Sequence, residues 1–234
     1  MTNPLKRIQS VERAFILLEA IAVLGGRARL NQLTEHCKLN KTTAHGLLNT
    51  LVSLGYVERD EGCYTLGARL PVLSAQVDAQ HQLIRTRFQS ILVYAANLSG
   101  ETSYLAVLGG NQDYIYAEAI QSGKSLRLAN PRGRREKLET SAIGKVFIAF
   151  NDGLVRQLLI SKDIASTLTN ELKLIRERGY AFDLEDAEIG LNCLAIPLYH
   201  EGKIEAVLGV AGPAARIPES QLRTFADNLQ RISL

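Results

Sequence analysis

Short polar side chains recur at helical spacing between Asn40 and Ser53, where they could form hydrogen bonds with nucleic acid. Hydroxyl, amide and imidazole groups of this size suit the base edges and phosphates of the major groove. A merely solvated helix face more often carries Glu, Lys and Arg, because those residues favour the helix. The alternative is a small surface helix with an unusual polar face. The candidate DNA contacts are Lys41, Thr42, Thr43, His45 and Asn49.

The opposite side of this segment carries the apolar residues that must hold such a helix in place. Asn40 can cap its first turn with the side-chain oxygen, and Gly55 stands where a helix can end. Positions i, i+3, i+4, i+7 and i+8 form one helix face. They are occupied by Ala44, Leu47, Leu48, Leu51 and Val52.

The flanking segments predict a winged helix-turn-helix. A short amphipathic helix over residues 30–37 and a tight turn at 38–40 lead into the polar helix, whose place is that of a major-groove recognition helix. Apolar and charged residues alternate on both sides of residues 60–62, which predicts a β-hairpin, and Arg59 on it could reach a phosphate. A helix from residue 10 to 24 completes the core. We expect Ser10 to cap it and its inward face to carry Val11, Ala14, Phe15, Leu18 and Ile21.

Composition describes an ordinary globular chain and does not by itself announce a nucleic-acid partner. The 234 residues are 46% hydrophobic and 22% charged, with a net charge of +3. DNA binding must therefore rest on local arrangement. No apolar run is long enough to span a bilayer, and no apolar signal core follows the first residues, so we expect a cytoplasmic protein without a membrane partner.

The second half of the chain predicts an α+β domain with an antiparallel sheet covered by helices. Between the helices and strands of this half, a loop rich in arginine and lysine is either solvated or attracts an anion or flanking DNA. The expected strands are 102–108, 113–120, 125–129, 192–198 and 204–212. The expected helices are 141–150, 153–160, 171–179 and 220–232. The basic loop carries Lys124, Arg127, Arg132, Arg134, Arg135 and Lys137.

No catalytic, metal or cofactor site is expected. Cys193 lies inside a predicted strand and His200 lies beyond its end, so a buried small hydrophobic residue is the simpler interpretation of this cysteine. Residues 142–146 contain Gly-Lys but lack the other residues of a phosphate loop. The three cysteines match no zinc-ligand spacing.

A long helix is expected between the two halves, beginning near Pro71. Its apolar residues are spaced by threes, fours and sevens, which indicates a seam that packs either against a second copy or against its own domain. The seam residues are Leu73, Val77, Ile84, Phe88, Ile91 and Ala95.

Several of these segments resemble the IclR family of bacterial transcriptional regulators. SVERAFILLEAI, LNQLTEHCKLNKTTAHGLLNTLVSLGYVERD and YTLGARL resemble its DNA-binding domain. LETSAIGKVFIAF, IRERGYAFDLEDAEIGLNCLAIPLY and AVLGVAGPAARI resemble its effector-binding half. The chain departs from the family at Lys38, usually glycine, and at Gly46, often arginine. The resemblance implies a winged helix-turn-helix over 1–69, a linker helix over 70–84 and a GAF-like effector-binding and oligomerisation domain over 85–234.

The resemblance also implies an effector site. The family's pocket uses backbone amides that correspond to Ala142 and Ile143, together with Asp183 and Cys193. Two further pocket positions that are often serine in the family are Gly209 and Ala211 here. The absence of the two serine hydroxyls would give a roomier and less polar pocket floor. A sugar acid or aromatic acid is then favoured over a very small keto acid. Alternatively, Gly209 and Ala211 only make room for a packed helix.

The sequence thus predicts a repressor that binds operator DNA as a homodimer or tetramer and responds to a small organic acid. No cofactor is expected. Two alternatives remain, namely an enzyme of GAF-like fold with a fused DNA-binding anchor, and an architectural DNA-binding protein whose second domain only dimerises.

Overall fold

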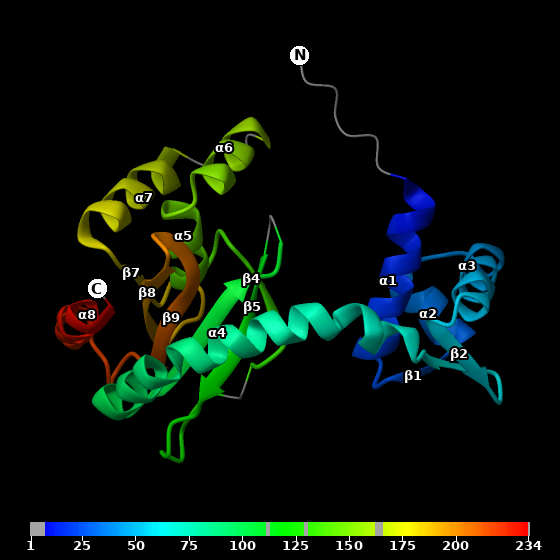
Figure 1. Cartoon of the computed structure of the whole chain (residues 1–234), viewed down its shortest axis with the longest axis horizontal. Helices are drawn as coiled ribbons and strands as arrows, with labels where there is room; N and C mark the ends of the chain where they lie inside the picture. The colour runs from blue at the N-terminus through cyan, green and yellow to red at the C-terminus, as the bar shows by residue number, and fades with distance from the viewer. Residues whose placement is uncertain (1–7, 111–112, 129–130, 162–165, 234) are drawn as a thin grey trace. The chain divides into compact units, whose positions relative to one another are not determined.

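The computed structural model describes residues 8–110, 113–128, 131–161 and 166–233 (Figure 1). The chain forms two compact units, the first ending at Ala79 and the second beginning at Gln80. One continuous helix, α4 (Arg69–Ser99), starts in the first unit and ends in the second. Among the described residues, no helix is long and apolar enough to cross a membrane.

The first unit is a three-helix core with a small antiparallel sheet at its side. Its helices are α1 (Gln9–Val23), α2 (Leu30–Cys37) and α3 (Lys41–Ser53). Its strands are β1 (Arg27–Arg29), β2 (Val57–Asp60) and β3 (Cys63–Leu66), in the order β1-β3-β2. The helices and the sheet share one core, which includes Leu17, Ile21, Leu33, Leu48 and Tyr64. The predicted winged helix-turn-helix is confirmed.

Two details of the predicted first helix are wrong. Ser10 does not cap α1, because Ile8 holds the N-cap position and no side chain accepts a hydrogen bond there. Val11 and Phe15 are 52% and 61% exposed, whereas α1 buries residues on a neighbouring face, namely Leu17, Ala20 and Ile21. Apolar residues surround this helix on nearly all sides, so spacing alone could not select the buried face. The predicted hairpin is present, and β1, which pairs with β3, was not foreseen.

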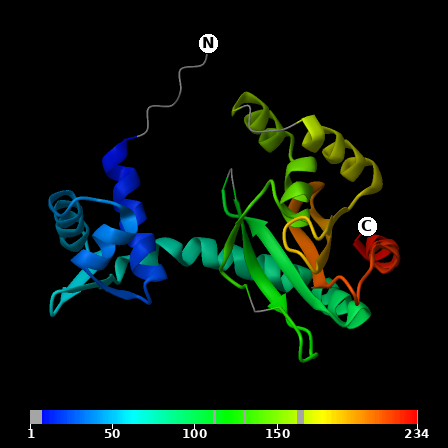
Figure 2. The same cartoon turned by 180° about the vertical axis from the view of Figure 1, so that it is seen from behind.

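The second unit is built on one six-stranded sheet with helices on both faces (Figures 1 and 2). All neighbouring strands are antiparallel, in the order β6-β5-β4-β9-β8-β7. The strands are β4 (Thr102–Leu108), β5 (Asp113–Ile120), β6 (Arg135–Lys137), β7 (Ala181–Leu184), β8 (Leu191–His200) and β9 (Lys203–Pro213). The helices are the second part of α4, α5 (Ala142–Ala149), α6 (Asp152–Ser161), α7 (Ser166–Arg178) and α8 (Glu219–Ser233).

The two faces of this sheet bury separate cores. One core joins α4 and α8 to alternate strand residues such as Leu105, Leu194 and Leu208. The other joins α5 and α7 to the residues between them, such as Tyr104, Ala195 and Val207. Because side chains along a strand point alternately to the two faces, every strand except β6 contributes to both cores. The expected α+β fold of this half is confirmed.

Two predicted features of the second half differ from the structure. Residues 125–128 of the predicted third strand are irregular, and residue 129 lies outside the described residues. The strand that pairs with β5 on the side away from β4 is instead β6, which is made of charged residues. The apolar seam of α4 divides in two, since Leu73 and Val77 are exposed. Its other members are buried in the second unit, namely Ile84, Phe88, Ile91 and Ala95.

Candidate functional site

Helix α3 presents the predicted polar residues to solvent. The Asn40 side-chain oxygen accepts a hydrogen bond from the Thr43 amide at 2.8 Å, which is the expected N-cap. Ala44 and Leu48 are fully buried on the other side and fix the rotation of the helix. As a result, the remaining polar side chains face outward. Lys41, Thr42, His45 and Asn49 are exposed, and Thr43 is half-buried.

Arg59 lies on β2, beside the predicted DNA-facing helix in the same compact unit. Its guanidinium sits 5.6 Å from the ring centroid of Tyr64, the residue opposite it on β3, and this stacking fixes its direction. At the tip of the hairpin, Arg27 of β1 lies 3.4 Å from both Asp60 and Glu61. This exposed cluster escaped sequence analysis because Arg27 is more than thirty residues from its partners.

The second unit contains a cavity of about 590 Å³ between the sheet and α5. The strand register explains its floor, because directly paired residues point to the same face of the sheet. Asp183 pairs with Cys193, and Cys193 pairs with Ala211. Gly209 lies in the adjacent row of the ladder, opposite Tyr104. All six predicted effector residues line this one cavity, namely Ala142, Ile143, Asp183, Cys193, Gly209 and Ala211.

The N-terminus of α5 forms one wall of the cavity. The Ser141 hydroxyl caps the helix by accepting a hydrogen bond from the Gly144 amide at 3.2 Å. The first amides of a helix have no intrahelical acceptor, so those of Ala142 and Ile143 remain to bind a ligand. Amides in this position favour an anion, because the helix dipole is positive there.

Tyrosine hydroxyls continue this wall, a feature that sequence analysis missed. The Tyr114 hydroxyl lies 2.9 Å from the Ser141 hydroxyl and 3.1 Å from that of Tyr116. Tyr104 packs against Tyr116 with ring centroids 5.3 Å apart. Burial raises the pKa of all three tyrosines, so they stay neutral. The wall therefore offers aromatic surface and uncharged hydrogen-bonding groups.

Asp183 supplies a buried carboxyl group at another side of the cavity. Its residue is 2% exposed, and its Oδ1 accepts hydrogen bonds from the amides of Asp186 and Ala187 at 2.9 and 3.2 Å. Burial raises the pKa of Asp183 despite these two bonds. Glu136 of the cavity lining lies on β6, at the other edge of the sheet, 2.8 Å from Arg134. Beside Asp183, the lining carries Asp186 and Glu188. This end of the cavity is therefore acidic.

Cys193 has the environment of an unreactive thiol. Burial raises its pKa, and the neighbouring Asp183 and Glu188 raise it further, so the thiolate is disfavoured. His200 lies at the other end of β8, about 23 Å away at the usual rise of a strand. Cys193 and His200 therefore do not form a catalytic pair.

The bare floor at Gly209 makes room for a helix side chain. A Cβ atom added to Gly209 would lie 2.8 Å from Cδ1 and 3.2 Å from Cγ1 of Ile143. Ile143 thus fills the space where a serine side chain would stand, and the expected gain in room is wrong at this position. Ala211 is 4% exposed and lines the cavity beside it.

Several cations of the basic loop form ion pairs. Arg135 lies 2.7 Å from Asp113, and Arg132 lies 3.4 Å from Glu118. Lys124 lies 2.7 Å from Glu101. These three cations therefore already have acidic partners within the second unit.

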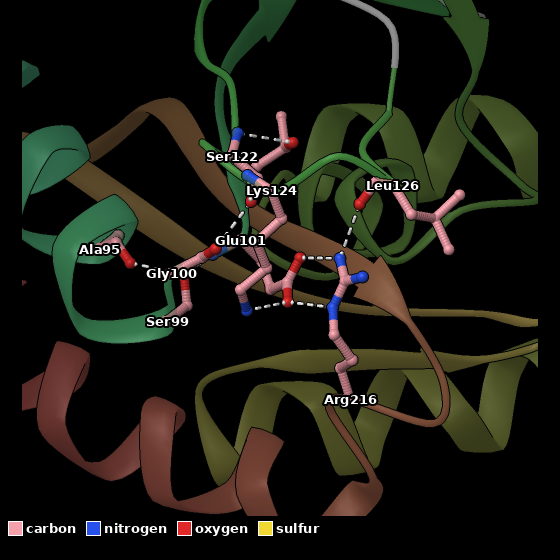
Figure 3. Close-up of polar contacts among 9 residues, drawn as sticks. Ala95, Ser99, Gly100, Glu101, Ser122, Lys124, Leu126 and Arg216 are labelled. Atoms are coloured by element: carbon pink, nitrogen blue, oxygen red, sulfur yellow. Dashed lines mark hydrogen bonds and ion pairs between the residues drawn. The ribbon is translucent and has the colours of Figure 1, made fainter.

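Glu101 is the centre of a buried charged cluster that sequence analysis did not find (Figure 3). The Arg216 guanidinium donates to both carboxylate oxygens, at 2.7 and 2.6 Å, and also to the Leu126 carbonyl at 2.9 Å. The Ser122 hydroxyl donates to the Gly100 carbonyl at 2.8 Å. These bonds fasten the segment 122–128, whose Leu128 lines the cavity, to the start of β4.

Comparison with known proteins identifies the family. Residues 10–61 match the IclR helix-turn-helix domain, and residues 76–234 match the bacterial transcriptional regulator IclR C-terminal domain. The chain belongs to the IclR family. It is 31% identical to the HTH-type transcriptional regulator XynR of Escherichia coli K12, over 97% of this chain and 95% of that protein. It is also 31% identical to the regulator KdgR of the same strain, over 93% and 87%.

Solved structures agree with the fold. The IclR protein of Thermotoga maritima superposes with a TM-score of 0.63 at 24% identity, covering 97% of this chain and 96% of that one. An IclR regulator of Silicibacter gives 0.74 at 22% identity, covering 96% and 93%. The IclR relatives are transcriptional regulators, not enzymes, which excludes the alternative of an enzyme with a DNA-binding anchor.

Proposed function

We propose that this IclR-family protein is a repressor whose affinity for operator DNA is controlled by a small organic acid. The observation that carries the proposal is the cavity in which Asp183, Cys193 and Ala211 meet the N-terminus of α5. Two relatives named as repressors support the direction of control, namely the transcriptional repressor IclR of Escherichia coli, 29% identical, and the acetate operon repressor of Salmonella typhimurium, 30% identical. The site of action is then the cytoplasm, where the DNA is.

Operator binding is assigned to the outward face of α3 and to the hairpin. Thr42, Thr43, His45 and Asn49 supply the hydrogen-bonding groups of the DNA-facing surface, whereas Lys41 and Arg59 supply positive charge for phosphates. Because Thr42 is exposed, its replacement by alanine should weaken operator binding and leave the melting temperature almost unchanged. Leu48→Ala should instead cost about 2–5 kcal/mol of stability, since Leu48 is fully buried.

The effector that fits the cavity is a monocarboxylate with hydroxyl groups or a ring. Its carboxylate would accept hydrogen bonds from the Ala142 and Ile143 amides. A hydroxyl at the other end would donate to Asp183, where the acidic lining repels a second carboxylate. A homolog from Microbacterium hydrocarbonoxydans was solved with 4-hydroxybenzoate, an acid of this class, and it has the same fold with a TM-score of 0.70.

A homodimer or tetramer is the proposed assembly. The first unit exposes Val11 and Phe15 of α1 together with Leu73 and Val77 of α4. Phe15 and Leu73 also line an apolar groove in this unit. A second copy would remove this surface from water, and its two-fold symmetry should appear as a palindromic operator. Light scattering tests this directly, and a strict monomer on an asymmetric site would contradict it.

The effector proposal is tested by filling the cavity. The response of operator affinity to a panel of hydroxylated and aromatic monocarboxylates and matched dicarboxylates would be measured for the parent, Ala211→Leu and Ala215→Leu. Ala215 lies in the exposed turn after β9, outside the cavity lining, so its variant is the matched control. We expect Ala211→Leu to bind DNA and lose the response, while Ala215→Leu keeps it. An Ala211→Leu protein that responds like the parent would place the effector elsewhere.

A further inference from the structure

The recognition helix contains a polar pair whose members have different tasks. The Asn49 side-chain amide nitrogen lies 3.3 Å from Nδ1 of His45, one helical turn away. Both residues are exposed. When the amide donates to Nδ1, this ring nitrogen carries a lone pair, and a neutral imidazole then holds its proton on Nε2. The outward ring nitrogen is therefore a hydrogen-bond donor.

The residue next to His45 has no side chain, and packing within the protein does not explain why. Gly46 lies in the interior of α3 and is exposed. A Cβ atom added to it would meet nothing within 4 Å. A glycine within a helix lowers stability relative to alanine, and no packing contact at this position requires a glycine. A missing side chain next to His45 allows the helix to approach DNA closely.

We propose that His45 reads a hydrogen-bond acceptor on a base edge, and that Asn49 positions its imidazole instead of reading a base itself. The assignment rests on the proposed use of α3 as the recognition helix. In the major groove, guanine offers two acceptors, O6 and N7, and no donor, whereas cytosine offers only a donor. Adenine and thymine offer one acceptor each, N7 and O4, so guanine gives the Nε2 donor the most partners and is the base expected at the position read by His45.

A selection from randomised DNA tests the assignment and also defines the operator. The purified full chain would select from a library of randomised duplex DNA. The variants His45→Ala, Asn49→Ala and Asn228→Ala would be carried through the same selection. Asn228 is the matched control, because its amide also donates one turn away, to Thr224 on α8.

The expected result is one half-site position at which the parent prefers guanine by about 3- to 10-fold, the range of a single hydrogen bond. His45→Ala should abolish the preference at that position alone. Asn49→Ala should weaken it at the same position and leave the others unchanged, and Asn228→Ala should match the parent. In the selected duplex, that guanine would be exchanged for adenine or for 7-deazaguanine, each of which lacks one of its acceptors. At least one exchange should lower the DNA affinity of the parent, and neither should change the affinity of His45→Ala.

Three outcomes would overturn the assignment. A His45-dependent preference for cytosine would show that Nε2 accepts a hydrogen bond. An Asn49→Ala variant that relaxes a different position would show that Asn49 reads its own base. A His45→Ala variant with the parent's consensus would remove His45 from recognition. Failure of the parent to enrich any sequence would instead refute the proposed operator binding, and the variants then have no sequence preference to lose.

Discussion

The replacement of Glu101 by glutamine should destabilise the second unit far more than the loss of an ordinary surface charge. The Glu101 side chain is 1% exposed, while those of Arg216 and Lys124 are 28% and 46% exposed. Glutamine keeps the shape of the side chain but removes the charge that both cations meet. It also turns one acceptor oxygen into a donor that faces them.

The magnitude follows from the burial of the three groups. Breaking a fully buried ion pair costs about 3–5 kcal/mol, because the remaining charge has no partner. Here the remaining cations reach water in part, and hydrogen bonds to charged groups contribute about 1.5–3 kcal/mol. We therefore expect a loss of about 2–3 kcal/mol. The exposed pair of Glu219 and Arg223 on α8 provides the control, since Glu219→Gln should cost less than about 1 kcal/mol.

Urea unfolding at neutral and acidic pH measures both effects. At a slope of about 1–3 kcal/mol per molar urea, this loss should lower the Glu101→Gln midpoint by about 0.7–3 M. Burial alone would raise the pKa of Glu101, but the hydrogen bonds from Arg216 and Lys124 outweigh it and lower that pKa. The contribution of Glu101 is therefore present above its ordinary pKa and lost as the pH falls through the lowered value. Part of the parent's acid sensitivity should disappear in Glu101→Gln. Equal midpoints for Glu101→Gln and Glu219→Gln would refute this reasoning.

Three substitutions that add or remove a glycine should change stability in different directions. Gly46→Ala should stabilise the chain by about 1 kcal/mol, because the added Cβ atom meets no other atom, and it should weaken operator binding. A thermal melt measures the stability and a gel-shift titration measures the affinity. An unchanged affinity would contradict a close approach of Gly46 to DNA. Lys38 has the left-handed conformation at φ 52°, so Lys38→Gly should gain about 0.5–1 kcal/mol in urea unfolding, and a loss would argue against strain there. Gly209→Ala should displace Ile143, costing about 1–3 kcal/mol of stability and reducing the effector response, whereas a variant with the parent's melting temperature and response would show that Ile143 moves freely.

Sequence alone predicts those elements whose signals are local. Helix α3 has its cap at Asn40 and its leucines on one face, so its bounds and both faces follow from spacing. The buried face of α1 does not, because apolar residues surround that helix. Residues 125–128 have the composition of a strand, but Arg216, ninety residues further on, binds the Leu126 carbonyl and joins this segment to Glu101. A contact between residues so far apart in the sequence produces no periodic pattern from which it could be predicted.

The candidate cavity shows the same division. Its six predicted residues came from the family resemblance, and the strand register shows why they meet. Tyr104, Tyr114 and Tyr116 were missed, because tyrosines in an apolar strand look like ordinary core residues. The position of Ile143 over Gly209 also depends on how α5 packs on the sheet, which no local pattern encodes.

The two cores of the sheet have a consequence for how the lining of the cavity can change. On β8 and β9, cavity-lining residues such as Cys193 and Ala211 alternate with residues such as Ile196 and Leu208, which belong to the opposite core. A substitution at Ala211 therefore changes the chemistry offered to a ligand without touching the face that packs on α4 and α8. The residues that pack on α4 and α8 can therefore stay the same while cavity-lining residues on the other face of the same strands change. Under the proposed function, related proteins could change the acid that they bind through the cavity face alone, while the opposite core is conserved.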